Sequence, residues 1–324
     1  MKRRLIWLTV LVVLFAPPAL TIAQDYPTKA ITLISPWPAG GGIDLLARAF
    51  ASVAEKYIDK PIVVVNKTGS FGTVGTLAGA QAKPDGYTLC MGLSQQNYII
   101  ILDRLAGRKP SFSMEDFVIL GRLTESPNIF LVPYNSPWKT IQQALADIKA
   151  HPDTYSCSSG GRYGVSHLPL ELLASELGLK FRSVPYDGGG PALMAVVGEH
   201  VHFAAQFPGT SLPKIRAKQL RGLAQFGEKR VKNYEDIPTF KELGYNVVYA
   251  PWFGMLAPKG TPPPIVEKLR TLVKQVTSDT AFIDIVEKIG DQVNYADAET
   301  LKKIIQKEYD EIHKLIERLE KEKK

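Results

Sequence analysis

Cysteine and histidine are scarce in this sequence, and each shortage excludes a class of protein. Two cysteines among 324 residues are too few for a disulfide-stapled scaffold. The five histidines are scattered along the chain without the spacing of a metal site. Beyond residue 23, no apolar stretch approaches the length of a membrane-spanning helix. Hydrophobic residues make up 45% of the chain and charged residues 22%, which is typical of a globular protein.

The motifs of several common enzyme classes are also absent. A dinucleotide-binding domain places an acidic residue at the end of its second strand, where this chain has Asn66 followed by Lys67. The glycines do not follow G-x-G-x-x-G, and neither a nucleotide P-loop nor a G-x-S-x-G nucleophile motif occurs. Ser159, Ser166 and His167 lie on one predicted loop, but a serine with a neighbouring histidine is not a triad. The sequence therefore favours a binding protein that is not an enzyme.

The first 23 residues have the form of a secretory signal peptide. Basic residues open the chain, an apolar segment spans 5–15, and Thr21-Ile22-Ala23 resembles a cleavage site that leaves Gln24 first. An uncleaved anchor is the alternative. Removing the three basic residues of the signal changes the net charge from +7 to +4. This mild excess suits a small anionic ligand and does not indicate nucleic acid.

Glycine-rich loops occur at four predicted junctions between a strand and a helix, at 36–44, 67–72, 159–167 and 187–191. Glycine lets the backbone turn tightly and lets a ligand approach it. The first N–H groups of each following helix lack intrahelical partners and favour an anion. For any single loop, tight packing is an equally good explanation. Because the same kind of loop occurs at four strand-to-helix junctions, the sequence indicates a binding site.

The alternation of strands and helices predicts an α/β fold with two domains, each containing a parallel sheet. We expect 24–126 and 249–324 to form domain 1 and 127–248 to form domain 2. The chain would cross between them near 124–128 and again near 246–251. In parallel α/β sheets the ligand lies beyond the carboxyl ends of the strands, so all four loops would face one interdomain cleft.

Two further expectations follow from the pattern of apolar residues. Cys90 and Cys157 lie in apolar, strand-like runs of different domains, which predicts two separate buried thiols. The last helix, from about 297 to 323, carries one apolar stripe and is expected to pack on domain 1.

The chain resembles the tripartite tricarboxylate transporter substrate-binding receptors, or Bug proteins, of bacterial periplasms. The resemblance covers nearly all of the chain after the signal peptide. Its motifs are Pro36-Trp37-Pro38-Ala39-Gly40-Gly41-Gly42-Ile43-Asp44 with Arg48, Val63–Gly69, Lys83–Leu89, Val184–Tyr186 with Gly188–Ala192, Asp236–Thr239, and Trp252–Gly254 with Ala257–Pro262.

The resemblance implies a type II, Venus-flytrap periplasmic binding fold with a cleft and two crossovers. It implies a monomeric periplasmic receptor that captures a small organic carboxylate, either a di- or tricarboxylate or an aromatic acid. The receptor would deliver this ligand to the permease subunits of a tripartite tricarboxylate transporter. No cofactor, metal or nucleic acid is expected. A receptor that feeds a sensor kinase, and a periplasmic hydrolase or isomerase of carboxylic acids, are the alternatives.

The candidate ligand-binding residues come from two lines of reasoning. The resemblance assigns contacts to backbone and small side chains at Ala39, Gly40, Gly41, Ser70, Ser158, Gly160 and Tyr186. The character of the loops adds the aromatic and polar side chains Trp37, Phe71, Gln95, Arg162, Tyr163 and Gln206. Core positions for Trp37 and Tyr186 are the alternative.

The chain departs from the family's pattern at four of these positions, and one of them is Gln95, which like Gln96 is unusual for the family. The third loop is usually small in the family, whereas here it carries Arg162 and Tyr163. Arg162 would pair with a second carboxylate or remain solvated. Gln206 and Phe207 stand where the family often has Asp or Asn. The side chains at these positions are expected to determine which group the receptor accepts at the distal end of the ligand, away from the carboxylate that the family binds.

Overall fold

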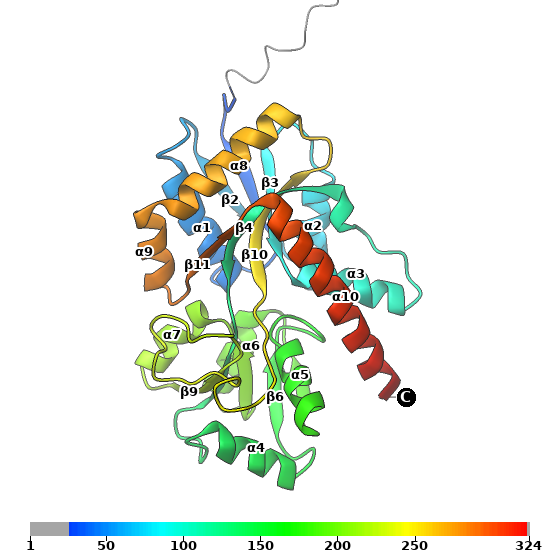
Figure 1. Ribbon diagram of the computed structural model, residues 1–324, viewed down its shortest axis with the longest axis vertical. Coiled ribbons are helices and arrows are strands. Elements are labelled where there is room, and N and C mark those ends of the chain that lie inside the picture. The colour runs from blue at the N-terminus through cyan, green and yellow to red at the C-terminus, as the bar shows by residue number, and fades with distance from the viewer. Residues whose placement is uncertain (1–25, 323–324) are drawn as a thin grey trace, which may run out of the picture.

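The computed structural model describes residues 26–322 of the chain. The expected signal peptide, 1–23, lies outside these residues. Two lobes lie one above the other, and each is built on one β-sheet with helices packed on it (Figure 1). The fold is therefore α/β, as predicted, but both sheets are mixed around a parallel core.

The first lobe contains a six-stranded sheet with the strand order β11-β4-β10-β3-β1-β2. Its strands are β1 (Ile31–Ser35), β2 (Ile62–Asn66), β3 (Thr88–Leu93), β4 (Phe117–Glu125), β10 (Trp252–Pro258) and β11 (Val293–Ala296). Its helices are α1 (Gly42–Ala54), α2 (Thr73–Ala80), α3 (Gln95–Leu105), α8 (Pro263–Ser278), α9 (Thr280–Lys288) and α10 (Ala298–Glu322), with short 3₁₀ turns at Ser70–Gly72 and Met114–Asp116. β1 is one continuous apolar run because helices cover both faces of the sheet, and Ile31 and Leu33 are fully buried.

The second lobe contains a five-stranded sheet with the strand order β7-β6-β8-β5-β9. Its strands are β5 (Ile129–Pro133), β6 (Ser156–Ser159), β7 (Arg182–Pro185), β8 (Phe203–Gln206) and β9 (Leu220–Gln225). Its helices are α4 (Ile141–Ala150), α5 (Leu168–Leu177), α6 (Gly189–Val197) and α7 (Pro208–Arg216). β6 runs parallel to β7 and β8, whereas β5 is antiparallel to β8 and β9.

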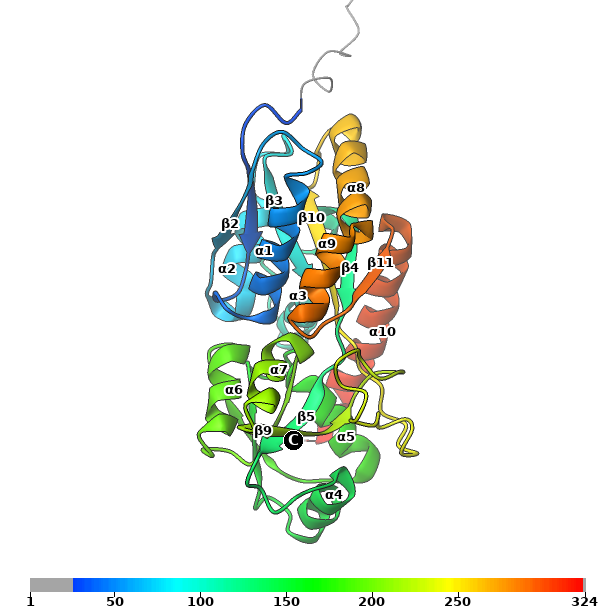
Figure 2. The ribbon, with the colours of Figure 1, turned by 90° about the vertical axis from the view of Figure 1, so that its left-hand side faces the viewer.

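The crossings between the lobes explain why the first sheet is mixed. β4 carries the chain toward the second lobe, and β10 brings it back (Figure 2). Because one strand leaves the lobe and the other returns to it, they run in opposite directions and pair as antiparallel neighbours. Since β10 also pairs with β3, it inserts one antiparallel strand beside the parallel core of β3, β1 and β2.

Four elements, α3, α7, α9 and β11, were not predicted from the sequence. The residues at the start of α3, 95–97, are all polar, and a polar run of this kind does not predict a buried helix. In the structure their side chains are buried and bonded inward; for example, the Gln96 Nε2 group donates to Thr76 Oγ1 at 3.1 Å. α7 contains Pro208 and Pro213, which read as helix breakers, but Pro208 stands in the first turn, where proline is tolerated.

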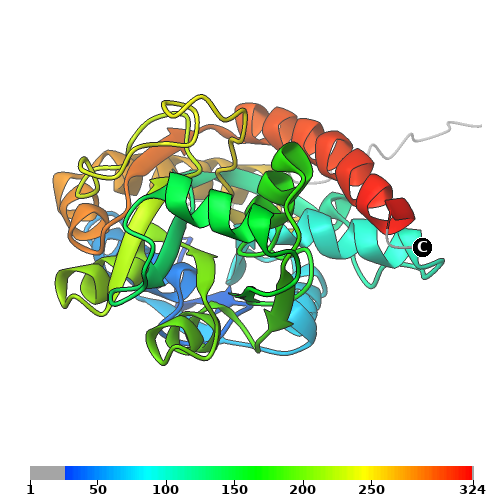
Figure 3. The same cartoon turned by 90° about the horizontal axis from the view of Figure 1, so that it is seen from below.

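The C-terminal helix α10 has the bounds predicted for it, but it reaches beyond the first lobe. Its stripe packs on the first lobe, where Leu301 and Ile316 are fully buried. Its last turns reach the second lobe beside α5 (Figures 1 and 3). There Glu320 accepts hydrogen bonds from Arg162 and from the Tyr163 hydroxyl, both at 2.6 Å. The helix therefore connects the two lobes in addition to the two chain crossings.

A buried carboxylate ties α10 to the crossing at β10. Glu308 accepts hydrogen bonds from Trp252 Nε1 at 2.8 Å, the Tyr98 hydroxyl at 2.9 Å and Asn97 Nδ2 at 3.1 Å. Burial raises the pKa of Glu308, while these donors act in the opposite direction. The two cysteines are free and buried in β3 and β6, as predicted.

A second buried carboxylate, Asp291, is expected to make the stability of the folded protein depend on pH. It accepts hydrogen bonds from the hydroxyl of Ser126, at the first crossing, and from the backbone N–H of Gln292. Burial raises the pKa of Asp291 to about 6. Its unfolded pKa is about 3.9. The folded state therefore holds this proton more tightly, and the stability associated with it is lost as the pH rises through about 6.

Urea denaturation of the wild type and of Asp291→Asn across a pH series measures this effect. We expect the free energy of unfolding of the wild type, relative to the variant, to fall by about 2 kcal/mol between pH ~4 and ~7. A difference that stays constant over this range would show that Asp291 ionises normally in the folded protein.

Candidate ligand-binding cleft

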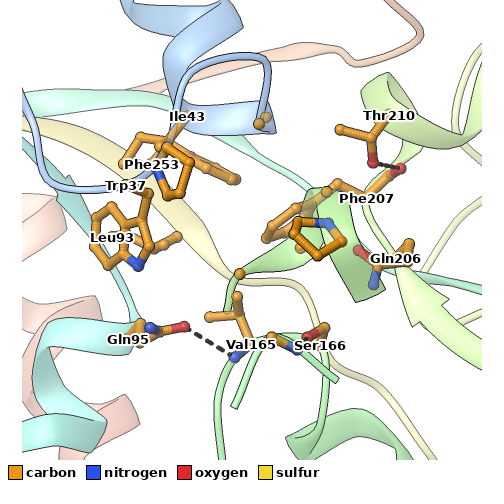
Figure 4. Close-up of a pocket in the computed structure, with 18 of the residues that line it drawn as sticks. Trp37, Ile43, Leu93, Gln95, Val165, Ser166, Gln206, Phe207, Thr210 and Phe253 are labelled. Carbon is orange, nitrogen blue, oxygen red and sulfur yellow. Dashed lines mark hydrogen bonds between the residues drawn. The ribbon is translucent and has the colours of Figure 1, made fainter. Parts of the chain in front are cut away.

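A cavity of about 90 Å³ lies between the lobes, where three of the four predicted glycine-rich loops meet (Figure 4). The second loop, 67–72, contributes no residue to its wall. The first lobe contributes the loop before α1, the end of β3, the first residue of α3, and Phe253 of β10. The second lobe contributes the loop after β6, the start of α6 and the segment from the end of β8 into α7. The cavity is thus formed by the carboxyl ends of strands from both sheets, as expected for parallel α/β cores.

The amino ends of three helices, α1, α6 and α7, lie at this cavity. α1 begins at Gly42, and its fourth residue is the first whose N–H bonds back into the helix, to Gly41 O. α6 begins at Gly189, so Gly189 and Gly190 have N–H groups outside the helical pattern. Thr210, in the first turn of α7, lines the same cavity. Helix dipoles and free N–H groups from both lobes together favour an anion at this place.

The buried carboxylate of Asp44 holds the first loop in place. It accepts hydrogen bonds from Gly40 N at 2.9 Å, Asn66 Nδ2 at 2.9 Å and Arg48 Nε at 3.1 Å. Asn66 also donates to the carbonyl of Trp37 at 3.0 Å. Burial raises the pKa of Asp44, but the bonds from Arg48, Gly40 and Asn66 outweigh it and leave the pKa below its usual value. The negative charge is therefore neutralised beneath the loop and does not face the cavity.

The cavity wall is apolar and uncharged. No Lys, Arg, His, Asp or Glu is among the described residues that line it. Two of the lining residues, Gln206 and Trp37, each carry a buried N–H group, Nε2 and Nε1 respectively, that has no hydrogen-bond acceptor among the described residues. Gln206 is 1% exposed. The amide oxygen of Gln206 lies on the cavity side, 3.3 Å from the position of a Cβ atom on Gly189.

The two lobes touch closely beside the cavity. Phe71 of the first lobe packs against Gly161 and Gly164 of the second. A Cβ atom on Gly161 would lie 1.9 Å from Phe71 Cε2. Gln95 Oε1 accepts from the backbone N–H of Val165 at 3.3 Å, and Figure 4 shows this bond across the cavity. The structure is therefore a closed arrangement of the lobes.

The structure brings six of the thirteen predicted ligand-binding residues to the cavity wall. They are Trp37, Ala39, Gly41, Gln95, Gly160 and Gln206. The wall also contains residues that were not assigned a ligand contact, namely Pro38, Gly42, Ile43, Leu93, Val165, Ser166, Gly188, Gly189, Gly190, Pro191, Phe207, Thr210 and Phe253. Several of these residues directly follow a glycine-rich loop or the end of a strand. That position could have identified them from the sequence as candidates for the cavity wall.

The other seven predicted residues lie outside the cavity wall, and most have structural partners. The backbone N–H of Gly40 bonds to Asp44. The Ser158 hydroxyl donates to Ala192 O at 2.7 Å. Phe71 forms the contact between the lobes described above. Ser70 begins the 3₁₀ turn Ser70–Gly72, and Tyr186 follows β7, where its backbone N–H donates to Ser159 O at 2.8 Å.

Arg162 and Tyr163 face away from the cavity, toward α10. Both bond to Glu320, and Arg162 lies 5.1 Å above the Tyr163 ring. The sequence offered no signal for this, because Glu320 is 158 residues away from Arg162. These two departures from the family's pattern connect the third loop to the C-terminal helix.

No described residues form a cluster of three or more potential metal ligands. Within 26–322, no helix combines the length and the apolar character needed to cross a bilayer.

The sequence matches the family model of the tripartite tricarboxylate transporter family receptor over residues 46–321. The chain belongs to this family. It is 32% identical over 298 residues to the UPF0065 protein in gbd 5'region of Cupriavidus necator, covering 90% of both chains. It is 30% identical over 263 residues to the protein BugT of Bordetella pertussis, covering 81% of this chain and 80% of BugT.

Solved structures confirm the periplasmic binding protein fold. A periplasmic transporter structure aligns with a TM-score of 0.85 at 30% identity, over 91% of this chain and 98% of that one. MatC from Rhodopseudomonas palustris with bound malate aligns with a TM-score of 0.81 at 26% identity, over 90% of this chain and all (100%) of MatC. The family is one of solute-binding receptors of periplasmic transporters and not of enzymes, as the missing catalytic motifs predicted.

Replacing Asp44 tests its role beneath the first loop. We expect Asp44→Ala to lower the free energy of unfolding by about 2 kcal/mol at neutral pH, because three hydrogen bonds to a charged group are lost. The loss should shrink at acidic pH, since a carboxylate with a lowered pKa stabilises only while it is ionised. Urea denaturation measures both effects, with the exposed Asp59→Ala as control. Equal losses in the two variants would contradict this role.

Gly161→Ala tests the contact between the lobes. The new methyl group would overlap Phe71, so we expect the lobes to separate and the radius of gyration in small-angle X-ray scattering to increase. Gly178→Ala is the matched control, because Gly178 also has a positive φ (+64°) but no atom within 4 Å of its would-be Cβ. If both variants expand equally, or neither does, the contact does not hold the lobes together.

Proposed function

We propose that this receptor captures a small organic carboxylate in the cleft between its lobes and delivers it to the permease of a tripartite tricarboxylate transporter. The observation that carries the proposal is the convergence of the amino ends of α1, α6 and α7 on one uncharged cavity. Such an arrangement stabilises an anion through backbone dipoles. The malate bound to MatC, a structural relative, supports a carboxylic acid as the ligand.

Capture would occur by hinge closure. We propose that 24–126 with 249–324 and 127–248 move as two units about the crossings near 124–128 and 246–251. Closure would bring α1 from one side and α6 and α7 from the other onto the same ligand. The ligand would then stabilise the closed form by contacts that neither lobe makes alone.

The family and the expected signal peptide, 1–23, both support a receptor that acts in the periplasm. We propose that 1–23 are removed on export and that the receptor works as a monomer in the periplasm. Recognition of the closed form by the permease subunits would make delivery dependent on ligand. Cross-linking to membranes that contain the permease should therefore increase when the ligand is added.

Ligand capture is tested by native mass spectrometry of the protein from Gln24 onward and a thermal-shift screen of mono-, di- and tricarboxylates and aromatic acids. We expect at least one acid to raise the melting temperature in proportion to the logarithm of its concentration. No shift with any acid would contradict the proposal. Consumption of an added ester or amide would favour an enzyme.

Gly189→Val tests the location of the site. A Cβ atom at Gly189 would lie 3.3 Å from Gln206 Oε1, so a valine side chain would occupy the cavity. We expect the acid identified in the screen to bind at least tenfold more weakly, by isothermal titration. Met194→Val, on the exposed face of the same helix, is the control for a β-branched residue in α6. Unchanged affinity in Gly189→Val would place the site elsewhere.

A further inference from the structure

Phe207 directly follows β8 and extends its ring across the cleft from the second lobe. The centroid of this ring lies 5.1 Å from that of Phe253, which belongs to β10 of the first lobe. A Cβ atom on Gly42, the first residue of α1, would lie 3.4 Å from Phe207 Cδ2. Figure 4 shows the Phe207 ring pointing into the space that Ile43 and Phe253 also face. One side chain of the second lobe therefore closes the cavity against two elements of the first.

The backbone around Phe207 fixes the position of this ring. Pro208 follows, and a proline restricts the residue before it to extended conformations. Phe207 is accordingly extended, with φ −64° and ψ 147°. Its carbonyl oxygen accepts hydrogen bonds from Ser211 N at 3.1 Å, Ser211 Oγ at 2.7 Å and Thr210 Oγ1 at 3.1 Å. The start of α7 thus holds the backbone that carries the ring, which makes Phe207 a fixed part of the wall.

The lobes also meet at a second place in the cavity wall. Gln95 Oε1 accepts from the backbone N–H of Val165 in the other lobe at 3.3 Å. The same amide is held within the first lobe, because its Nε2 group donates to Phe71 O at 3.1 Å. A ligand too large for the space between the lobes must therefore separate the rings of Phe207 and Phe253 or break the bond between Gln95 and Val165.

The space that these contacts enclose is small. The cavity has a volume of about 90 Å³. A dry cavity of about 150 Å³ accepts benzene, so the space here suits a short aliphatic chain better than an aromatic ring. Since the Phe207 ring lines the cavity, removing it is a single change that adds the volume of a ring to this space.

We propose that Phe207 sets the upper size limit of the ligand, so that the receptor takes short aliphatic acids and excludes aromatic and long-chain ones. The inference rests on the proposed function, since it names the class of acid that the same cavity takes. A short acid fits beside the ring while Phe207 and Phe253 stay in contact and the lobes stay closed. A larger acid pushes the ring away from Phe253 and loses the contact between the lobes that encloses the ligand.

Isothermal titration with two series of acids tests the size limit. The monocarboxylates are acetate, butanoate, hexanoate, octanoate and the aromatic benzoate. The dicarboxylates are malonate, glutarate, pimelate, azelate and the aromatic terephthalate. Because affinities are compared within a series, the test does not depend on the number of carboxylates that the receptor accepts. In the series that binds, we expect a short member to bind at least tenfold more tightly than the longest member and than the aromatic member.

Phe207→Ala separates the role of the ring from that of the rest of the cavity. We expect the affinity for the aromatic acid, relative to that for the best short acid, to rise at least tenfold, because the cavity gains the space of a ring. Phe207→Leu should raise this ratio less. Since the ratio is measured on one protein, a small loss of stability does not affect it.

Phe181→Ala is the matched control for the loss of a phenylalanine ring. Like Phe207, Phe181 is half-buried and packs on a buried ring, that of Phe203, with 5.1 Å between the centroids. It lies outside the cavity wall. The control should therefore keep the ratio of affinities of the wild type.

The remaining outcomes distinguish this inference from the proposed function. If the wild type binds the longest or the aromatic member most tightly, the receptor binds carboxylates but the size limit is wrong. If both Phe207 variants keep the wild-type ratio, Phe207 does not set the limit. If no acid of either series binds and the wider screen of acids also fails, the proposed function and the inference are both wrong.

Discussion

The bonds to the Asp44 carboxylate position the amino end of α1, and the rest of the site depends on them. Three donors reach it from the loop, from α1 itself and from the end of β2. Because one of these donors, Asn66, also holds the Trp37 carbonyl, a single buried network sets both the path of the loop and the aromatic wall. The network places its negative charge beneath the loop and leaves neutral donors above it. The cavity can therefore attract an anion without containing a cation.

Closure of the lobes is supported by contacts on both sides of the molecule. Beside the cavity, Phe71 fills the space left by two glycines of the third loop. On the far side of that loop, Arg162 and Tyr163 bond to Glu320 of α10. The third loop thus lies between the cavity and the C-terminal helix, which it contacts through side chains outside the cavity wall. The buried Glu308 anchors the same helix to the start of β10, where the chain returns from the second lobe.

Local patterns in the sequence were sufficient for the fold class, for most strands and helices and for the glycine-rich loops that meet at the cleft. They failed where tertiary contacts decide the outcome. The polar start of α3 is helical because its side chains find buried partners such as Thr76. Six predicted ligand-binding residues line the cavity, but Arg162 does not, because its partner Glu320 is remote in sequence. The apolar wall around Phe253 was missed for the same reason, since a strand residue shows which face it occupies only once the sheets are placed.

The most direct test of this account is a ¹⁵N-resolved NMR titration of the protein with an acid that raises its melting temperature. The account predicts the largest downfield shifts of backbone amide protons at Gly42, Gly189 and Gly190, because these N–H groups would bond to the ligand. Gly107, on the exposed turn after α3, should not shift. Shifts concentrated elsewhere, for example around α5 and the last turns of α10, would contradict the central claim that helix amino ends in the cleft hold the anion.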